Sequence, residues 1–236
     1  MVTKEEKGEI KRLLQKVTTA PNTPATQPPL LAASVSDLAA TPTTKASPCI
    51  IVELEQGTCE WLEWRHKGIG ASDAPVVMGE NPWKTAAQLL HEKRGRPARE
   101  SIQNAAMARG TLLEPEARRR YISRTGRDVQ PACLQSREHD WLRASVDGLT
   151  NSGDVVVEIK CGDSVYRNTS QNGCVPDYYY GQLQHILAVT GLKSLDFWCY
   201  LPRLPEILVP VKRDNDYIER LLKLEYQFWK DVLRSA

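Results

Sequence analysis

The sequence predicts a protein of the α/β (α+β) class, with a central mixed β-sheet flanked by helices. Two patterns lead to this prediction: amphipathic helical stretches occupy much of 57–125, and short stretches rich in β-branched residues begin at 128. Helical patterns return at 178–191 and 216–233, so helices and strands alternate in the second half. The 236 residues, 41% hydrophobic and 25% charged, are typical of a globular chain with room for one substantial core.

The first 48 residues differ in composition from the rest. Pro, Thr, Ala and Ser dominate 17–48, and no Phe, Trp or Tyr occurs before Trp61. Such a segment has too little apolar surface to offset the entropy lost on ordering. We therefore expect a flexible N-terminal extension over 1–48 and a single domain over 49–236. The charged stretch 1–16 is either a short amphipathic docking helix or a frayed tail.

Cap and breaker residues set the expected helices in the first half of the domain. One helix is expected at 57–65. Ser72 or Asp73 is expected to cap a short helix that ends at 78, and Thr85 to begin a helix that ends near 95. Pro115 is expected to interrupt or kink a longer helix over 102–125, because proline lacks the backbone N–H that a helix interior requires.

The second half predicts five strands and two helices. Strand patterns lie at 128–134, 142–149, 155–161, 195–201 and 206–212, with an Asn-Ser-Gly turn at 151–153. The helices are expected at 178–191 and 216–233. Apolar spacing in the last helix predicts a buried face that contains Ile218, Leu221, Leu222, Tyr226 and Trp229.

The most informative feature is a pair of neighbouring strands with the sequences S-V-D-G at 145–148 and V-E-I-K at 157–160. Alternate side chains share one face of a strand, so Glu158 and Lys160 project together. A tight turn is expected to bring Asp147, at the end of the preceding strand, beside Glu158. Carboxylate oxygens suit Mg²⁺ or Mn²⁺, and such an ion turns water into a nucleophile and stabilises phosphodiester charge. Taken alone, however, Glu-x-Lys is more often a solvated ion pair.

Further blocks surround these strands in a fixed order. They are R-H-K-G-I-G-A-S-D at 65–73, R-G-T-L-L-E at 109–114, E-I-K-C at 158–161 and Y-Y-G-Q-L-Q at 179–184. The combination resembles the YqaJ-type viral recombinase (phage lambda exonuclease) family, within the PD-(D/E)xK nuclease superfamily. Val146 stands where many members of the superfamily carry proline before aspartate. The resemblance implies a restriction-endonuclease-like PD-(D/E)xK core.

The resemblance also implies roles for individual residues at a metal site. Asp147 and Glu158 would be the Mg²⁺ ligands, with the main-chain carbonyl of Ile159 completing the shell. Lys160 would be the catalytic lysine. Glu114 would be a helix-borne acid beside the metal, holding a second ion or a water, and Mn²⁺ would substitute for Mg²⁺.

The resemblance implies that four residues other than these metal-site residues contact DNA. Gln182, which also belongs to the catalytic set, and Tyr179 would bridge the active site and the DNA backbone. Arg65 and Ser72 match positions that form a pocket for a 5′-terminal phosphate in the family. Without the resemblance, Arg65 fits a surface residue and Ser72 fits a helix cap. Gln182 and Gln184 lie on opposite sides of a helix, so one of them fits a structural role.

Charge is unevenly distributed along the chain, whose formal net charge is +2. Counting from the sequence, 84–143 holds 13 Lys and Arg against 7 Asp and Glu, a local excess of +6. Such an excess is what a surface needs to neutralise DNA phosphates and release counterions. Arg109, Arg120 and Arg124 are candidate backbone contacts, although a solvated helix face gives the same pattern. The sequence contains no base-reading motif, so sequence-independent binding is expected.

The function implied by the resemblance is that of a Mg²⁺-dependent 5′-to-3′ exonuclease on linear double-stranded DNA. It would release mononucleotides and leave 3′ overhangs for recombination by strand annealing. The implied partners are DNA with a 5′-phosphorylated end, a single-strand annealing recombinase and further copies of the chain in a homotrimer. Two alternatives stay open: a restriction or junction-resolving endonuclease on the same core, and a non-catalytic DNA-binding scaffold.

Compartment is indicated only by what the sequence leaves out. No stretch approaches the ~18 consecutive apolar residues of a membrane span. The charged start has no apolar signal region, so cytoplasmic localisation, in a bacterial or phage-infected cell, is expected. The six cysteines form no C-x-x-C pair and are expected to be free thiols.

Overall fold

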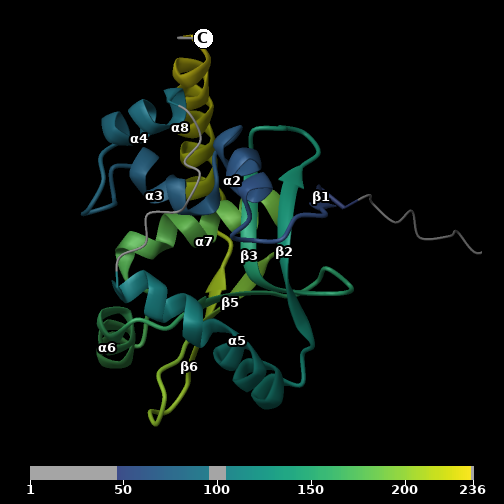
Figure 1. The fold of residues 1–236 in the computed structure, drawn as a ribbon, viewed down its shortest axis with the longest axis vertical. Coiled ribbons are helices and arrows are strands. Elements are labelled where there is room, and N and C mark those ends of the chain that lie inside the picture. Colours follow the sequence, from purple (N-terminus) through teal and green to yellow (C-terminus); the bar gives the residue numbers. More distant parts are fainter. Residues whose placement is uncertain (1–46, 96–104, 235–236) are drawn as a thin grey trace, which may run out of the picture. The chain divides into compact units, whose positions relative to one another are not determined.

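The computed structural model describes residues 47–95 and 105–234 (Figure 1). The described residues belong to one compact unit, which lies within 45–236. Most of the expected extension over 1–48, with its possible helix at 1–16, lies outside the described residues, as does the start of the helix expected from 102. Five of the six cysteines (Cys49, Cys133, Cys161, Cys174 and Cys199) are free thiols, as predicted for them. None of the described helices is long and apolar enough to cross a membrane.

The core of the described part is one mixed sheet of six strands in chain order. Each strand pairs antiparallel with its neighbours, except that β4 and β5 run parallel. This arrangement confirms the predicted α+β class with a mixed sheet. The strands are β1 (Cys49–Val52), β2 (Val129–Ser136), β3 (Arg143–Thr150), β4 (Val156–Lys160), β5 (Ser194–Cys199) and β6 (Ile207–Lys212).

Two helices, α6 (Asp163–Asn172) and α7 (Asp177–Thr190), connect β4 to β5. Parallel neighbours need such a crossover, because the chain must return to the starting edge of the sheet. On β5, Phe197 packs in the core that contains α7, whereas the adjacent Trp198 packs against α5 (Ala105–Thr125). Successive side chains of a strand point to opposite faces, so α5 and α7 cover opposite faces of the sheet.

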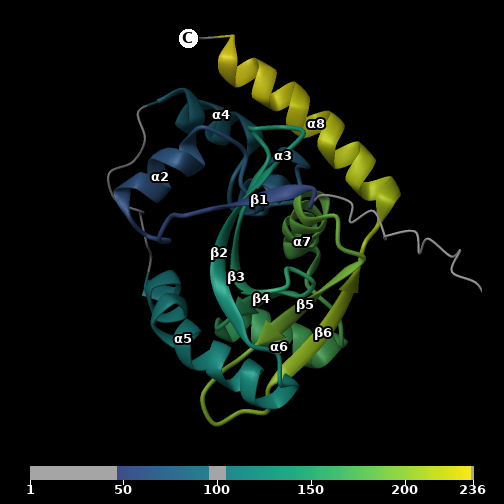
Figure 2. The same ribbon diagram turned by 90° about the vertical axis from the view of Figure 1, so that its right-hand side faces the viewer.

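Five further helical elements complete the described part, and those at 71–73, 74–77 and 215–233 pack against α7. They are α2 (Cys59–His66), the 3₁₀ turn η1 (Ala71–Asp73), α3 (Ala74–Val77), α4 (Ala86–Arg94) and α8 (Asn215–Leu233). Figures 1 and 2 show α3, α4 and α8 grouped at the end of the domain opposite α5 and α6. The helix ends at Thr85 and Gly95 agree with prediction, since Oγ1 of Thr85 accepts the N–H of Gln88 at 3.3 Å.

The buried face of α8 differs from the predicted one. Ile218 and Leu221 are buried as predicted, but Tyr226 is 51% exposed. The buried position beside it belongs to Glu225, whose carboxylate pairs with Nδ1 of His185 on α7 at 2.7 Å. An apolar pattern alone assigns a glutamate to solvent, and only its buried partner explains why it lies inside.

Several other expectations on the elements were wrong. Strand β1 and helix α6 were not predicted, because β1 has only four residues and α6 (DSVYRNTSQN) is rich in poor helix formers. Helix α5 includes Pro115, so the predicted interruption is absent, whereas a kink at this residue stays a prediction. Of the two candidate caps, Asp73 occupies the N-cap position of α3, whose C-cap is Met78, as predicted. Ser72 lies inside η1, where its Oγ accepts a hydrogen bond from Arg65.

Gly148 follows Asp147 in a crowded part of the sheet. A Cβ added there would lie 2.6 Å from Cγ1 of Val157 and 2.8 Å from Cγ2 of Val129. Both neighbours are fully buried, so neither side chain has space to move away. The glycine of the S-V-D-G block therefore allows close packing between β2, β3 and β4.

We predict that Gly148→Ala lowers the free energy of unfolding by about 1–3 kcal/mol, the usual cost of overpacking a core. Gly110→Ala is the matched control, because an added Cβ at this helical glycine meets nothing within 4 Å. It should be neutral or stabilising, since alanine favours a helix over glycine. Urea unfolding of both variants measures the difference, and equal stabilities would contradict the packing account.

Candidate active site

The site begins where β3 and β4 part. The last paired residues are Leu149 with Val156 and Gly148 with Val157. At the next position a side chain takes the place of a backbone hydrogen bond between the strands: Oδ2 of Asp147 accepts the backbone N–H of Ile159 at 2.7 Å. Asp147 lies in the middle of β3 and not at its end as expected, since the turn begins only after residue 150. The carboxylate thus wedges the two strands apart beside Glu158.

Glu158 is the buried centre of the site, with 2% of its surface exposed. Its Oε1 accepts two hydrogen bonds, from Nζ of Lys160 at 2.5 Å and from Nε2 of Gln182 at 2.6 Å. Its Oε2 is buried and has no hydrogen-bond partner. An unsatisfied buried carboxylate oxygen is costly, so it points to a ligand that the site is built to bind.

Burial and mutual repulsion perturb the carboxyl groups strongly. Burial, followed by the charge of Asp147, raises the pKa of Glu158 to about 7. Burial also raises the pKa of Asp147, although Lys160 opposes the change. Burial would lower the pKa of Lys160, but the charges of Glu158 and Asp147 outweigh it and raise this pKa. Such perturbed groups are typical of functional sites.

Helix α5 adds a third carboxylate and an arginine. Burial, followed by the charge of Asp147, raises the pKa of Glu114 to about 6. Arg118 forms an ion pair with Glu114, and its Nε donates to the backbone oxygen of Asp147 at 2.7 Å. The sequence interpretation did not assign a site role to Arg118. Its spacing of four residues from Glu114, which places both on one helix face, was the available signal.

Helix α7 supplies the opposite wall of the site. Nζ of Lys160 lies 4.9 Å from the ring centroid of Tyr179, one helical turn before Gln182. The structure therefore brings Tyr179 and Gln182 to the carboxylates. Gln184 is structural: its Nε2 donates to the backbone oxygen of Lys212, and its Oε1 accepts the N–H of Asp214, both at 2.9 Å.

Arg65 and Ser72 form a second cluster that β3 joins to the first. Nη2 of Arg65 donates to Oγ of Ser72 at 2.7 Å, and the guanidinium lies 4.7 Å from the ring centroid of Trp61. The indole N–H of Trp61 donates to Oγ of Ser145 at 2.8 Å. Ser145 is two residues before Asp147, so one strand, β3, carries a residue of each cluster.

A lysine that the sequence did not reveal braces this second cluster. Nζ of Lys93 donates to the backbone oxygens of Arg65 at 3.1 Å and Gly68 at 2.7 Å, and pairs with Asp73 at 2.9 Å. Burial raises the pKa of Asp73, but Lys93 and then Arg65 outweigh it and hold this pKa at about 2. The acceptors are 20 to 28 residues away in sequence, so no local pattern marks Lys93.

The three candidate DNA contacts on α5 each pair with an acidic side chain. Nη1 of Arg109 lies 2.9 Å from Oδ2 of Asp163 on α6. Arg120 and Arg124 contact the two carboxylate oxygens of Glu206 at 3.0 and 3.8 Å. All three arginines are more than half exposed, so solvent screens these pairs. No contact among the described residues links them to the carboxylates of the site.

The fold has relatives among nucleases of known structure. The alkaline exonuclease LHK-Exo from Laribacter hongkongensis is similar in two crystal structures, one of them in complex with dAMP, each with a TM-score of 0.66. The two sequences are 30% identical, and the match covers 74% of this chain and 92% of that chain. The mixed sheet and flanking helices are therefore those of a nuclease fold.

The family model of the YqaJ-like viral recombinase domain matches residues 60–193, and the chain belongs to this family. The uncharacterized protein YqaJ of Bacillus subtilis (strain 168) is 29% identical over 193 residues, which cover 80% of this chain and 60% of that protein. The uncharacterized protein R354 of Acanthamoeba polyphaga mimivirus is 30% identical over 161 residues, covering 62% and 29% respectively. The chain thus spans 60% or less of these two relatives.

Members of this family are metal-dependent nucleases in general. Within the described residues, no three His, Cys, Asp or Glu side chains lie close enough to hold an ion by themselves. Mg²⁺ usually takes only one or two carboxylates and completes its shell with water and substrate phosphate. Asp147 and the unpartnered Oε2 of Glu158 meet that requirement, so the residues present fit a hard divalent cation.

The raised pKa of Glu158 predicts a pH-dependent stability in the absence of metal. The pKa of Glu158 is about 7 in the folded protein against 4.5 for a free glutamate, so the folded state favours the protonated carboxyl group. The stability that this protonated group contributes is fully present below pH 4.5 and is lost as pH rises through 7. Between about pH 5 and about pH 8, the wild type should lose on the order of 2 kcal/mol more than Glu158→Gln. Urea unfolding in excess EDTA measures this, and identical pH profiles would contradict the assigned burial.

Proposed function

We propose that the chain is a Mg²⁺-dependent exonuclease that digests linear double-stranded DNA from the 5′ end, with Mn²⁺ able to replace Mg²⁺. One observation carries this proposal: the carboxylates of the half-buried Asp147 and the buried Glu158 converge with Lys160, and Oε2 of Glu158 lacks a partner. The family supports a DNA substrate, and the dAMP bound to LHK-Exo is the kind of mononucleotide that an exonuclease releases. The digested duplex would keep a 3′ overhang.

The proposed reaction assigns separate tasks to the side chains. Asp147 and Glu158, with the carbonyl of Ile159, would hold the ion, and Glu114 would hold a second ion or a water. A bound divalent cation would supply charge stabilisation of the phosphodiester and activation of water. Lys160 stays protonated, so its ammonium group donates hydrogen bonds to the attacking water or a phosphate oxygen.

The surrounding groups keep these side chains in place. The amide of Gln182 holds Oε1 of Glu158, so Oε2, which has no hydrogen-bond partner, would be available to hold the cation. Arg118 fixes the backbone of Asp147 and the carboxylate of Glu114 together. The ring of Tyr179 limits the movement of Lys160 and contributes a cation–π contact. Preorganisation of this kind is the main source of electrostatic catalysis.

Arg65 and Ser72 account for the proposed direction of digestion, from the 5′ end. A guanidinium group forms bidentate, charge-assisted bonds with a phosphate, and a hydroxyl adds a further donor. We therefore assign the terminal 5′-phosphate to this pair, while the scissile phosphate lies at the carboxylates. The proposal includes two assemblies carried over from the family resemblance: a homotrimer, and a single-strand annealing recombinase that receives the 3′ overhang. Arg109, Arg120 and Arg124 would contact the duplex backbone after exchanging their acidic partners for phosphates.

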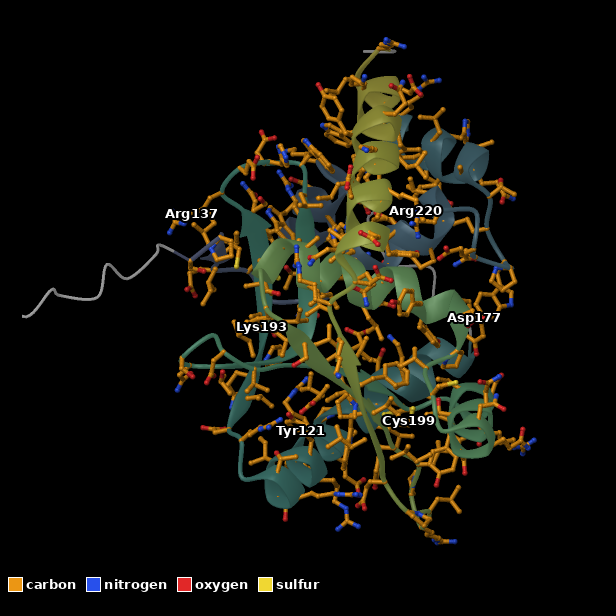
Figure 3. The ribbon with its side chains drawn as sticks, turned by 180° about the vertical axis from the view of Figure 1, so that it is seen from behind. Tyr121, Arg137, Asp177, Lys193, Cys199 and Arg220 are labelled. Atoms are coloured by element: carbon orange, nitrogen blue, oxygen red, sulfur yellow. The ribbon has the colours of Figure 1, made fainter. Side chains whose placement is uncertain are left out.

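The catalytic assignment predicts that Glu158→Gln and Lys160→Ala each reduce digestion of linear duplex DNA by at least about 10³-fold. Lys193→Ala is the matched control, because Lys193 is an exposed lysine away from the site. It precedes the first residue of β5, whereas Lys160 pairs with Cys199 at the other end of that strand (Figure 3). The control variant should digest DNA at the wild-type rate. Wild-type turnover by either site variant would contradict the assignment.

End dependence separates the exonuclease from the two alternatives. Covalently closed circular DNA should remain intact under conditions that digest the linear form. Nicking or linearisation of the circle would favour the endonuclease, and binding without digestion of either form in Mg²⁺ would favour the scaffold. Gel electrophoresis of both forms after incubation with the wild type distinguishes the three outcomes.

The phosphate assignment predicts that wild-type protein degrades 5′-phosphorylated duplexes faster than 5′-hydroxyl duplexes, and that Arg65→Ala removes this preference. The variant should lose at least about tenfold on phosphorylated ends and change little on hydroxyl ends. Arg119→Ala is the control, because this exposed arginine makes no hydrogen bond or ion pair within the described part of the chain. An unchanged preference in Arg65→Ala would place the phosphate elsewhere.

A further inference from the structure

Trp83 is a large aromatic side chain held out from the surface near the site. It is 71% exposed, the most exposed aromatic side chain among the large hydrophobic residues that the structure describes. An indole of this size normally buries most of its surface. The proposed catalysis uses neither Trp83 nor its surroundings, so its exposure calls for a separate explanation.

The turn that carries Trp83 is preorganised. Oδ1 of Asn81 accepts the backbone N–H groups of Trp83 and Lys84, both at 2.9 Å. Pro82 restricts the backbone between them, and the Thr85 cap starts α4 immediately afterward. The indole is therefore displayed by a fixed backbone, which lowers the entropy cost of binding a ligand against it.

An aromatic row runs from Trp83 to the catalytic lysine. The ring centroid of Trp83 lies 5.0 Å from that of Tyr178 in an edge-on contact, with an interplanar angle of 79°. The Tyr178 and Tyr179 centroids are 4.8 Å apart, and Nζ of Lys160 lies 4.9 Å from the Tyr179 ring. Both tyrosines lie on the first turn of α7, next to Asp177, which Figure 3 labels. Because Trp83 meets Tyr178 edge-on, much of its indole surface stays available for stacking.

An open hollow adjoins the indole on the side of α4. Its volume is about 600 Å³, within the usual range for sites that bind small molecules. The indole of Trp83 and the imidazole of His91 line it and suit an aromatic ring. The ammonium group of Lys84, which pairs with Glu92, suits an anion. The lining residues are Trp83, Lys84, Ala87, Gln88, His91 and Glu92.

We infer that Trp83 is a stacking platform for an unpaired nucleobase of the DNA bound at the active site. Every base has a π-face, so stacking on an aromatic side chain tolerates all sequences, in keeping with the lack of a base-reading motif. The row through Tyr178 and Tyr179 makes the platform continuous with Lys160. Lys84 lies beside the indole, where it is placed to contact the phosphate of the stacked nucleotide. This inference rests on the proposed DNA-processing function and adds a subsite to it.

Binding in the absence of metal tests the platform without relying on catalysis. The probe is a fluorescein-labelled oligothymidylate of about 16 nucleotides, titrated in EDTA at fixed salt and followed by anisotropy. Trp83→Ala should weaken binding by about tenfold, in the range expected for the loss of one stacked base. Trp83→Phe should restore most of the affinity. Tyr226→Ala is the matched control, because it removes another exposed aromatic ring, on α8, and should bind like the wild type.

The outcomes separate this inference from the proposed function. Wild-type affinity of Trp83→Ala for the oligothymidylate would overturn the platform even if the protein digests linear duplexes. Failure of the wild type to digest DNA, with the loss of affinity in Trp83→Ala intact, would overturn the exonuclease and keep the platform. A change in sedimentation mass of Trp83→Ala with unchanged DNA affinity would assign the indole to a protein interface and also overturn the inference.

Discussion

The buried carboxyl group of Glu158, which is ionised above about pH 7, is the constraint on which the rest of the site depends. It lies on β4, in the middle of the sheet, where helices cover both faces and water is largely excluded. A charge in such a place needs partners, and the structure supplies Lys160 and Gln182 to one oxygen only. The other oxygen stays unsatisfied, which costs stability and reserves a position for a cation. The arrangement therefore lowers the stability of the metal-free fold and raises its affinity for a metal ion.

The fold makes this arrangement possible by ending the β3–β4 ladder early. Asp147 takes the N–H of Ile159 with its side chain, so the strands separate and a second carboxylate enters the gap. Helices α5 and α7 then supply groups from opposite faces, Arg118 from one and Gln182 from the other. The same strand β3 extends the site toward Arg65 through the bond between Ser145 and Trp61. One central hairpin thus carries Asp147, Glu158 and Lys160, and the surrounding helices add the remaining groups.

The sequence predicts those features that depend on local spacing. Alternation along a strand placed Glu158 and Lys160 on one face, and the order of the blocks indicated the family. Contacts between distant segments escaped: Lys93 braces backbone oxygens far away in sequence, and Glu225 is buried only because His185 meets it. Short or polar elements such as β1 and α6 also escaped, since their stability comes from the neighbours on which they pack and not from intrinsic propensity.

Metal-dependent thermal unfolding tests most directly whether the unpartnered Oε2 of Glu158 is a ligand for a cation. Metal-free protein would be heated in rising concentrations of Mg²⁺ at about pH 8, where the carboxylate is ionised. The account predicts that Mg²⁺ raises the Tm of the wild type in a saturable manner and leaves that of Glu158→Gln unchanged. An equal rise in both proteins, or no rise in the wild type, would contradict it.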